Sequence, residues 1–503
     1  MSGWRIGLAM ALAAVAVAPA GAGGWKAGVA VRVITPREPM WLAGYAGRTK
    51  PAEGKEHDLK VKALALQDEA GKTAVLLTAD LIGIPRSLGE AVCAETTRRT
   101  GVARERILLT ASHTHCGPVV RDNLADMYPM PPEEARKIEP YTRQLAGWMV
   151  EAIEEAVKRL APAELSVGTG AAGFAVNRRK PTPAGVINDR NPAGPVDHAV
   201  PVLLVSAADG KPLAVAFGYA CHNTTLPFYR WCGDYAGFAQ AELEARHPGL
   251  TALFWTGCGA DANPLPRGTV ELCRRYGKEL ADAVSVVMAG KRTPVRGTLT
   301  ARYATVELPF QQLPTKEQVA AALLSKDHAV RKRAEKQRAV LEKGGALAAA
   351  YPHYPVQVWR LGEQVLWVAL GGEVVVNYSL RLKKELAGGP TVWVAGYAND
   401  VMAYIPSLRV LKEGGYEADS SMIYYGLPSP WGPSIESRIV EKVHALSAAT
   451  RAVIAAAVHT LHKEKTLTTE DTEEHRGQRE KSGKDRMPGA RRWVARPEAW
   501  RRA

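Results

Sequence analysis

Residues 106–118 read RILLTASHTHCGP, an apolar run followed at once by two histidines and a Gly-Pro pair. A short apolar run of this kind is typical of a strand buried on both faces, and Gly117-Pro118 turns the chain sharply after it. In layered α/β folds, the side chains that carry chemistry collect where buried strands end and loops begin. The segment therefore predicts a buried strand that places His113 and His115 at one end of a sheet.

The same strand-like pattern recurs along the chain and alternates with helical patterns. Strand-like runs are found at residues 29–34, 59–66, 73–79, 163–170, 199–207, 213–222, 251–259, 356–372 and 391–398. Helical periodicity covers residues 87–101, 132–160, 235–247, 268–289, 316–341 and 436–462. This alternation predicts an α/β fold with a layered mixed β-sheet and flanking helices. No long Ser-, Pro- or Gly-rich linker divides residues 25–460, so we expect one large catalytic domain there.

The first residues, MSGWRIGLAMALAAVAVAPAGAGGWK, have the pattern of an export signal. Arg5 supplies a positive charge, residues 6–17 are apolar, and Ala20-Gly21-Ala22 is a small-residue cleavage site. The apolar run is shorter than the roughly 20 residues that a membrane span needs. We therefore expect residues 1–22 to be a signal peptide and the protein to be secreted or periplasmic, with an uncleaved anchor as the alternative.

The formal net charge is +14 over 503 residues, and two segments carry more than half of it. Residues 326–343 contribute +4 and follow helical spacing, which indicates a solvated helix face. Residues 463–503 also contribute +4 and are almost free of aliphatic residues, so we expect a disordered charged tail. Because the remaining charge is spread thinly, a nucleic-acid groove is disfavoured, and no nucleic-acid partner is expected.

The chain has 6 cysteines, few for its length, and none forms a CxxC pair. A structural zinc cluster of cysteines is therefore not expected. Export would permit disulfides, but the spacing does not specify any, and small buried thiols are an equally good interpretation.

Four further polar segments follow apolar runs or precede a helix. They are GYACHNTT at 218–225, CGDYAG at 232–237, WTGCGADANP at 255–264 and LGGE at 370–373. Neutral imidazole suits Zn²⁺, so the histidines at strand ends favour a zinc site. Each segment alone is equally compatible with a structural role, such as a helix N-cap for Asp234 or a surface turn for Glu373. Composition alone favours structural roles for the tyrosines of residues 396–417.

Taken in order, these segments resemble the neutral/alkaline non-lysosomal ceramidase family over most of residues 28–446. The matching motifs are AGVAVRVITP (27–36), AGYAGR (43–48), Gly54 with His57-Asp58, Asp80, HTHCGP (113–118), Asn177-Arg178, ACHNT (220–224), GDYAGFA (233–239), GCGADANP (257–264), GGE (371–373), GYANDVMAYIP (396–406) and EGGYE (413–417). Each motif is weak alone, whereas the ordered set is specific.

The resemblance implies a zinc-dependent amidohydrolase that uses metal-activated water to cleave the linear amide of an N-acyl lipid, as in sphingolipid metabolism. The family's ligands of one Zn²⁺ ion correspond to His113, His222, Glu373 and Tyr404. Its second motif histidine corresponds to His115, which would assist hydrolysis by moving a proton. Arg178 and Tyr416 are expected to hold substrate. We further expect Asp234 and Asp261 to support the histidines.

The sequence departs from the family at Ala262, where ceramidases carry a serine that has been proposed as catalytic. A mechanism that needs this hydroxyl cannot operate here. The immunoglobulin-like C-terminal module of ceramidases is not expected, and the segments that shape their acyl pocket are not clearly matched. Two alternatives therefore stay open: a non-catalytic protein that binds a lipid or glycan, and a zinc esterase or phosphoesterase with a second metal on Asp80, Asp234 and Asp261. Peripheral membrane contact and the oligomeric state also stay open.

Overall fold

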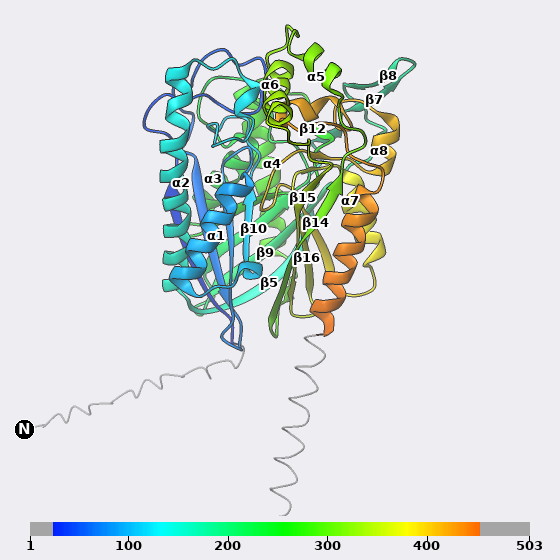
Figure 1. Ribbon diagram of the computed structural model, residues 1–503. Coiled ribbons are helices and arrows are strands. Elements are labelled where there is room, and N and C mark those ends of the chain that lie inside the picture. The colour runs from blue at the N-terminus through cyan, green and yellow to red at the C-terminus, as the bar shows by residue number, and fades with distance from the viewer. Residues whose placement is uncertain (1–23, 453–503) are drawn as a thin grey trace, which may run out of the picture. The chain divides into compact units, whose positions relative to one another are not determined.

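The computed structural model describes residues 24–452 (Figure 1). The predicted signal peptide, residues 1–22, and the predicted tail, residues 463–503, lie outside the described residues. In the part of the chain that the structure does describe, no helix is both long enough and apolar enough to cross a membrane.

A large mixed sheet contains most of the strands predicted before residue 260. Its path runs β11-β10-β9-β5-β1-β2-β3-β4, with β13 paired to β5. These strands are β1 (Lys26–Val33), β2 (Lys60–Gln67), β3 (Thr73–Ala79), β4 (Ile107–Ala111), β5 (Ala161–Ala171), β9 (Ala199–Ala207), β10 (Pro212–Tyr219), β11 (Thr251–Thr256) and β13 (Thr293–Pro294). The pairs β3–β4 and β10–β11 are parallel, and the others are antiparallel.

A second sheet packs on one face of the first. It has the order β14-β15-β16-β18 and consists of β14 (Leu299–Pro309), β15 (Ala350–Leu361), β16 (Val365–Leu370) and β18 (Thr391–Ala395). The apolar run predicted at 356–372 is a hairpin, because the chain turns at Gly362, where φ is 53°. Leu64 and Leu66 of β2 face the second sheet, and Ala63 and Ala65 face the opposite side. Both faces of β2 are thus apolar, as expected of a strand buried on both sides.

Helices cover the two outer faces, so the fold has four layers in the order α/β/β/α (Figure 1). The helices on the large sheet are α1 (Arg86–Thr100), α2 (Pro132–Lys158), α3 (Asp234–Arg246) and α4 (Val270–Ala289). The second sheet is covered by α7 (Val376–Glu385), which was not predicted, and by the helix formed by residues 435–452. The predicted α/β class with flanking helices is confirmed, and the structure divides its strands between two sheets.

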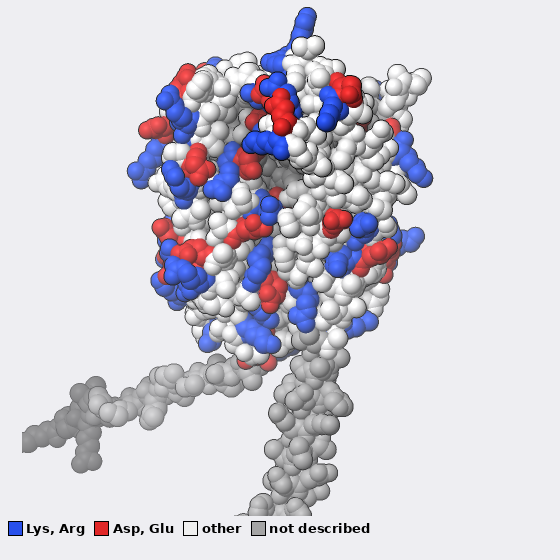
Figure 2. All heavy atoms as spheres, in the orientation of Figure 1, with Lys and Arg blue, Asp and Glu red and all other residues white. Residues whose placement is uncertain are grey.

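The predicted helix at residues 316–341 is wrong in one respect, because it is two helices. These are α5 (Lys316–Ala322) and α6 (His328–Glu342). The Asp327 carboxylate accepts hydrogen bonds from the backbone N–H groups of Ala329 and Val330 and so starts a new helix. Of the basic residues of α6, Lys336 and Arg338 are exposed, whereas Arg331, Lys332 and Arg333 are half-buried, so the predicted solvated face holds only in part. Figure 2 shows cationic and anionic side chains interspersed over the face in view.

Short elements connect the layers and shape the loops. They are the strands β6 (Ala175–Asn177), β7 (Arg179–Thr182), β8 (Gly185–Asn188), β12 (Ala262–Pro264), β17 (Glu373–Val374) and β19 (Tyr404–Ile405), the helix α8 (Leu408–Glu413), and the 3₁₀ turns η1 (Arg104–Arg106), η2 (Ala125–Met127) and η3 (Ser420–Tyr425).

The large sheet curls until the ends of its two edge strands, β4 and β11, meet. The Thr256 hydroxyl donates a hydrogen bond to the Ala111 carbonyl at 2.9 Å. Residues 395–399 continue from β18 between the two strands and form bridges with Gly257 on one side and Thr110 on the other. The loops that follow β4, β10 and β18 are thereby brought to one place.

Candidate metal centre and active site

Two histidines meet in this place, one after the edge strand β4 and the other after β10, which is next to the opposite edge strand. His113 lies two residues beyond β4 with φ at 59°, a left-handed conformation that is rare outside glycine. The backbone N–H of His222, three residues beyond β10, donates to the Ala262 carbonyl at 2.9 Å. A parallel bridge between Thr114 and Asn223 joins the two loops. The ring centroids of His113 and His222 are consequently 4.8 Å apart.

Backbone carbonyls set the orientation of both rings. Nδ1 of His113 lies 2.6 Å from the Ile82 carbonyl, and Nδ1 of His222 lies 2.9 Å from the Gly259 carbonyl. A carbonyl oxygen only accepts hydrogen bonds, so each Nδ1 carries the proton and each Nε2 presents a lone pair. Burial, assisted by the Arg178 charge, lowers the pKa of His222 to about 4, so this ring is neutral at neutral pH.

Glu373 adds a carboxylate oxygen to the two imidazole nitrogens. It begins β17, which pairs in parallel with β19 so that Glu373 lies opposite Tyr404. Its Oε2 lies 3.2 Å from Nε2 of His113 and 3.2 Å from Nε2 of His222. This oxygen is buried and accepts no hydrogen bond from the described residues. Three acceptor atoms at such distances repel one another unless a proton or a metal cation lies between them.

Two tyrosines complete the surroundings of Glu373. The Tyr404 hydroxyl lies 3.2 Å from Nε2 of His222. Burial and the neighbouring Glu373 carboxylate raise the pKa of Tyr404 above its ordinary value, and Arg178 opposes this rise. The Tyr425 hydroxyl donates to Oε1 of Glu373 and leaves Oε2 directed at the histidines. Tyr425 was not predicted, since it follows no apolar strand and comes from η3.

The side chains of His113, His222, Glu373 and Tyr404, hereafter the candidate metal centre, fit a metal ion. Two imidazole nitrogens, one carboxylate oxygen and one phenol oxygen form a donor set that suits Zn²⁺. The carbonyls behind both rings are the outer support that metal-binding histidines generally have. The unpartnered Oε2 of Glu373 is an orphaned polar atom of the kind that a cation would satisfy.

His115 lies beside the candidate metal centre. Its Nε2 is 3.3 Å from Nε2 of His113, and its Nδ1 has no hydrogen-bond partner among residues 24–452. Gly44, with φ at 103°, makes room for the ring, because a Cβ atom there would lie 2.3 Å from Nδ1. Burial, followed by the neighbouring imidazoles, holds the pKa of His115 well below its usual range. The ring is therefore neutral at neutral pH, and its Nε2 is the nitrogen nearer the candidate metal centre.

Arg178 and Tyr416 reach the same place from different parts of the chain. Nε of Arg178 donates to Glu417 at 2.8 Å, and Nη2 donates to the Tyr404 hydroxyl at 3.1 Å. The Tyr416 ring lies against the Tyr404 ring, with centroids 5.2 Å apart. Burial alone would lower the pKa of Arg178, but Tyr404 and Glu417 hold it well above its ordinary value. Glu417 was not predicted as a site residue, although it belongs to the EGGYE motif.

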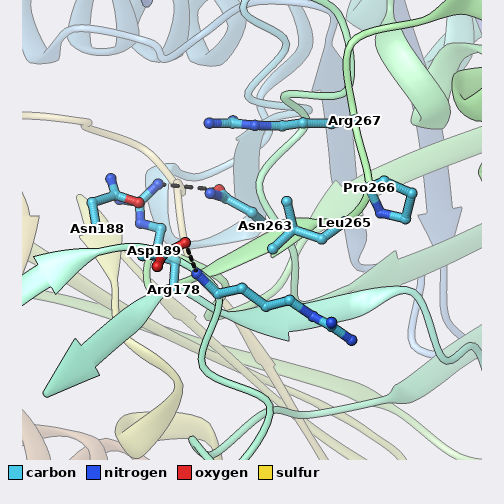
Figure 3. A pocket seen from close by; sticks show the side chains of 8 residues that line it. Arg178, Asn188, Asp189, Asn263, Leu265, Pro266 and Arg267 are labelled. Atoms are coloured by element: carbon cyan, nitrogen blue, oxygen red, sulfur yellow. Dashed lines mark hydrogen bonds between the residues drawn. The ribbon is translucent and has the colours of Figure 1, made fainter.

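A cavity of about 460 Å³ opens beside Arg178 (Figure 3). Its lining residues are Arg178, Asn188, Asp189, Arg190, Asn263, Leu265, Pro266 and Arg267. Arg178 links this cavity to the candidate metal centre, because its Nη1 lies 3.2 Å from Oδ1 of Asn263 and 3.4 Å from Nε2 of His222.

Asp234 and Asp261 do not contact the histidine rings, so the prediction that they support the rings is wrong. The Asp234 carboxylate accepts hydrogen bonds from the backbone N–H groups of Thr225 and Leu226, at 3.1 and 2.9 Å. The Asp261 carboxylate accepts one from Val376 at 2.8 Å. Both carboxylates hold the backbone near the site, and carbonyl groups orient the rings instead.

Ala262 serves the site through its backbone. It lies fully buried in β12, pairs with Asn177 of β6, and offers its carbonyl to the N–H of His222. The 6 cysteines are all buried and none is paired in a disulfide.

Comparisons with known proteins agree with this architecture. Residues 25–253 match the family model of the neutral/alkaline non-lysosomal ceramidase, N-terminal. No curated protein sequence matches the chain. The crystal structure of neutral ceramidase from Pseudomonas aeruginosa is 20% identical, with a TM-score of 0.66 over 86% of this chain and 75% of that one. A solved structure described as ceramidase complexed with C2 is 18% identical, with a TM-score of 0.66 over 86% of this chain and 76% of that one.

These two structures show a shared fold, and the family model adds the sequence signature. Residues 25–253 carry the sequence signature of the neutral/alkaline non-lysosomal ceramidase family, N-terminal.

Proposed function

We propose that the protein is a zinc-dependent amidohydrolase that cleaves the amide bond of a ceramide-like N-acyl lipid. The match of residues 25–253 to the ceramidase family model and the shared fold support the hydrolysis of ceramide. One observation carries the metal dependence: Nε2 of His113, Nε2 of His222 and Oε2 of Glu373 face one another, and no hydrogen-bond donor of the described chain serves Oε2.

His113, His222, Glu373 and Tyr404 would hold the ion. Bound zinc supplies a Lewis acid for the substrate carbonyl and makes water nucleophilic near neutral pH. Because Ala262 lacks a hydroxyl, direct attack by water fits this chain better than an acyl-enzyme at that position.

His115 is the group that moves the proton. Its Nε2 lies 3.3 Å from Nε2 of His113, beside the candidate metal centre, where it could accept a proton from the attacking water and return it to the leaving amine. Arg178 and Tyr416 flank Tyr404 and orient the substrate, and the Arg178 charge stabilises negative charge that develops on the carbonyl oxygen.

Metal analysis of the purified protein tests the ligands. We expect about one zinc per chain in the wild type, as for a mononuclear catalytic site, and loss of zinc in His113→Ala and His222→Ala. His198→Ala is the matched control, because His198 binds the Ala175 carbonyl. If both ligand variants keep stoichiometric zinc, the assignment is wrong, and a ratio near two in the wild type would favour a phosphoesterase.

A hydrolysis screen over N-acyl amides and esters, with and without a chelator, tests the reaction. We expect chelator-sensitive hydrolysis of amides, and a loss of about 10²- to 10⁴-fold in kcat in His115→Ala with zinc retained. Wild-type rates in His115→Ala would remove the proton-transfer role from this residue. Absence of turnover in the wild type would favour a lipid- or glycan-binding protein.

We also propose that the protein is exported, secreted or periplasmic. The charge of Arg5, the apolar residues 6–17 and the small residues 20–22 support this. Cell fractionation with N-terminal sequencing should find a mature chain that starts near Gly23, and an intact N-terminus in the cytoplasm would contradict the proposal.

A further inference from the structure

The cavity beside Arg178 carries two cationic side chains without a counter-charge. Arg190 and Arg267 both line it and are exposed, and neither guanidinium has a hydrogen bond or ion pair among the described residues. The one carboxylate of the lining, Asp189, is engaged by Lys180 at 2.6 Å and by the backbone N–H of Arg190 at 2.7 Å. The cavity is therefore electropositive.

The backbone that carries these two arginines is anchored. The N–H of Asp189 donates to the Arg178 carbonyl at 2.9 Å, which ties the Arg190 segment to the site. In the loop that carries Arg267, the Tyr276 hydroxyl donates to the Pro266 carbonyl at 2.6 Å. The N–H of Gly268 donates to the Thr225 carbonyl at 2.8 Å. In Figure 3, Arg267 lies on the far side of Asn263 from Asp189. The two arginines thus approach the cavity from separate, fixed loops.

The cavity also adjoins the candidate metal centre. Arg178 forms part of its wall and contacts His222, with Nη1 3.4 Å from Nε2. Asn263 accepts a hydrogen bond from Arg178, and its own amide nitrogen has no partner within residues 24–452. A group bound in the cavity would meet this amide donor and would be separated from the metal centre by a single side chain.

We propose that this cavity binds an oxyanion, a carboxylate or a phosphate, carried by the substrate close to the scissile amide. The inference rests on the proposed amidohydrolase function and refines its substrate class to anionic N-acyl compounds. Guanidinium groups match the planar geometry of carboxylate and phosphate oxygens, and they offer little to a substrate without charge. A neutral ceramide would leave both Arg190 and Arg267 without a counter-charge.

Three substrates that share one acyl chain test the proposal: an N-acylglycine, an N-acyl phosphoethanolamine and the neutral N-acylethanolamine. The kcat/KM of the wild type should be about tenfold or more higher for a charged substrate than for the neutral one. Which charged substrate is preferred distinguishes carboxylate from phosphate.

Arg267→Gln and Arg190→Gln should each lower the ratio of charged to neutral kcat/KM severalfold, mainly through KM, because they remove binding that is equal in the ground and transition states. Arg143→Gln is the matched control, an exposed arginine on α2 outside the cavity lining, and should keep the wild-type ratio.

A wild-type ratio near one, or ratios unchanged in both cavity variants, would overturn the inference and leave the amidohydrolase proposal intact. If none of the three amides is hydrolysed, the proposed function fails instead. In that case, calorimetric measurement of the binding of N-acylglycine and of inorganic phosphate tests the proposed oxyanion site without reference to turnover. Binding that is lost in Arg267→Gln supports it, and absent or unchanged binding overturns it.

Discussion

At the candidate metal centre, a neighbouring group occupies one of the two polar side-chain atoms of each histidine and of Glu373. The carbonyls of Ile82 and Gly259 occupy Nδ1 of the two histidines, so Nε2 of each ring faces the candidate metal centre. Tyr425 occupies Oε1 of Glu373, so Oε2 is free. Because each ligand presents one atom in a fixed direction, little reorganisation is needed when a cation binds.

Tyr425→Phe should weaken zinc binding by about 10- to 100-fold, since loss of an outer partner frees the carboxylate to rotate. Competition titration against a chelator measures this, and circular dichroism checks that the variant is folded. Tyr424→Phe is the matched control, because the neighbouring Tyr424 makes no hydrogen bond to Glu373 among the described contacts. Equal zinc affinity in Tyr425→Phe and the wild type would show that Tyr425 does not orient Glu373.

At the scale of elements, short segments are tied together by buried polar side chains. Asp261, next to β12, accepts a hydrogen bond from the N–H of Val376 in the first turn of α7. It also accepts one from Asn177 of β6 at 3.2 Å. Burial raises the pKa of Asp261 from 3.8 to about 6, although the Val376 hydrogen bond opposes the rise. The carboxyl therefore holds its proton more tightly in the folded chain than in the unfolded chain.

This raised pKa predicts a pH dependence of stability. The contribution of Asp261 to folding is fully present below about pH 4 and is lost as the pH rises through about 6. Asp261→Asn cannot titrate, so its free energy of unfolding relative to the wild type should rise between pH 4 and 6, by on the order of 2–3 kcal/mol.

Urea unfolding at several pH values measures this difference. Asp122→Asn, which changes an exposed carboxylate, serves as the control. Parallel stability curves for Asp261→Asn and the wild type would contradict the assigned pKa shift.

At the scale of the whole described fold, the two sheets are held together by an aromatic layer. Trp367 of β16 is 1% exposed and packs on Trp255 of β11 and Trp393 of β18, with ring centroids 5.2 and 5.3 Å away. These rings bury a large apolar area between the sheets. Strands of the large sheet can be apolar on both faces because helices cover one face and this layer covers the other.

Trp367→Ala should lower the free energy of unfolding by about 3–5 kcal/mol, because it leaves a cavity between the sheets. Urea unfolding followed by circular dichroism measures the change. Leu324→Ala removes a side chain that is 86% exposed and should change stability by less than about 0.5 kcal/mol. A similarly small effect for Trp367→Ala would mean that the sheets are held together elsewhere.

Much of the fold could be predicted because strands and helices follow from the periodicity of neighbouring residues. Helices α1 to α4 begin and end within two residues of the predicted bounds. The break at Asp327 was missed because a local cap overrode a continuous helical pattern. The candidate site residues were inferred from strand ends and from the ordered motifs, and their roles as ligands and catalytic groups stay predictions.

The sequence by itself determined the α/β class, the strands that end at His113 and His222, and the family resemblance, since each depends on residues close together in the chain or on the order of motifs. Only the tertiary structure decided how these ends meet. Residues 395–399 join the two edge strands, and β17–β19 pairing brings Glu373 beside Tyr404. Such contacts depend on sheet curvature and long-range register, which local periodicity does not encode.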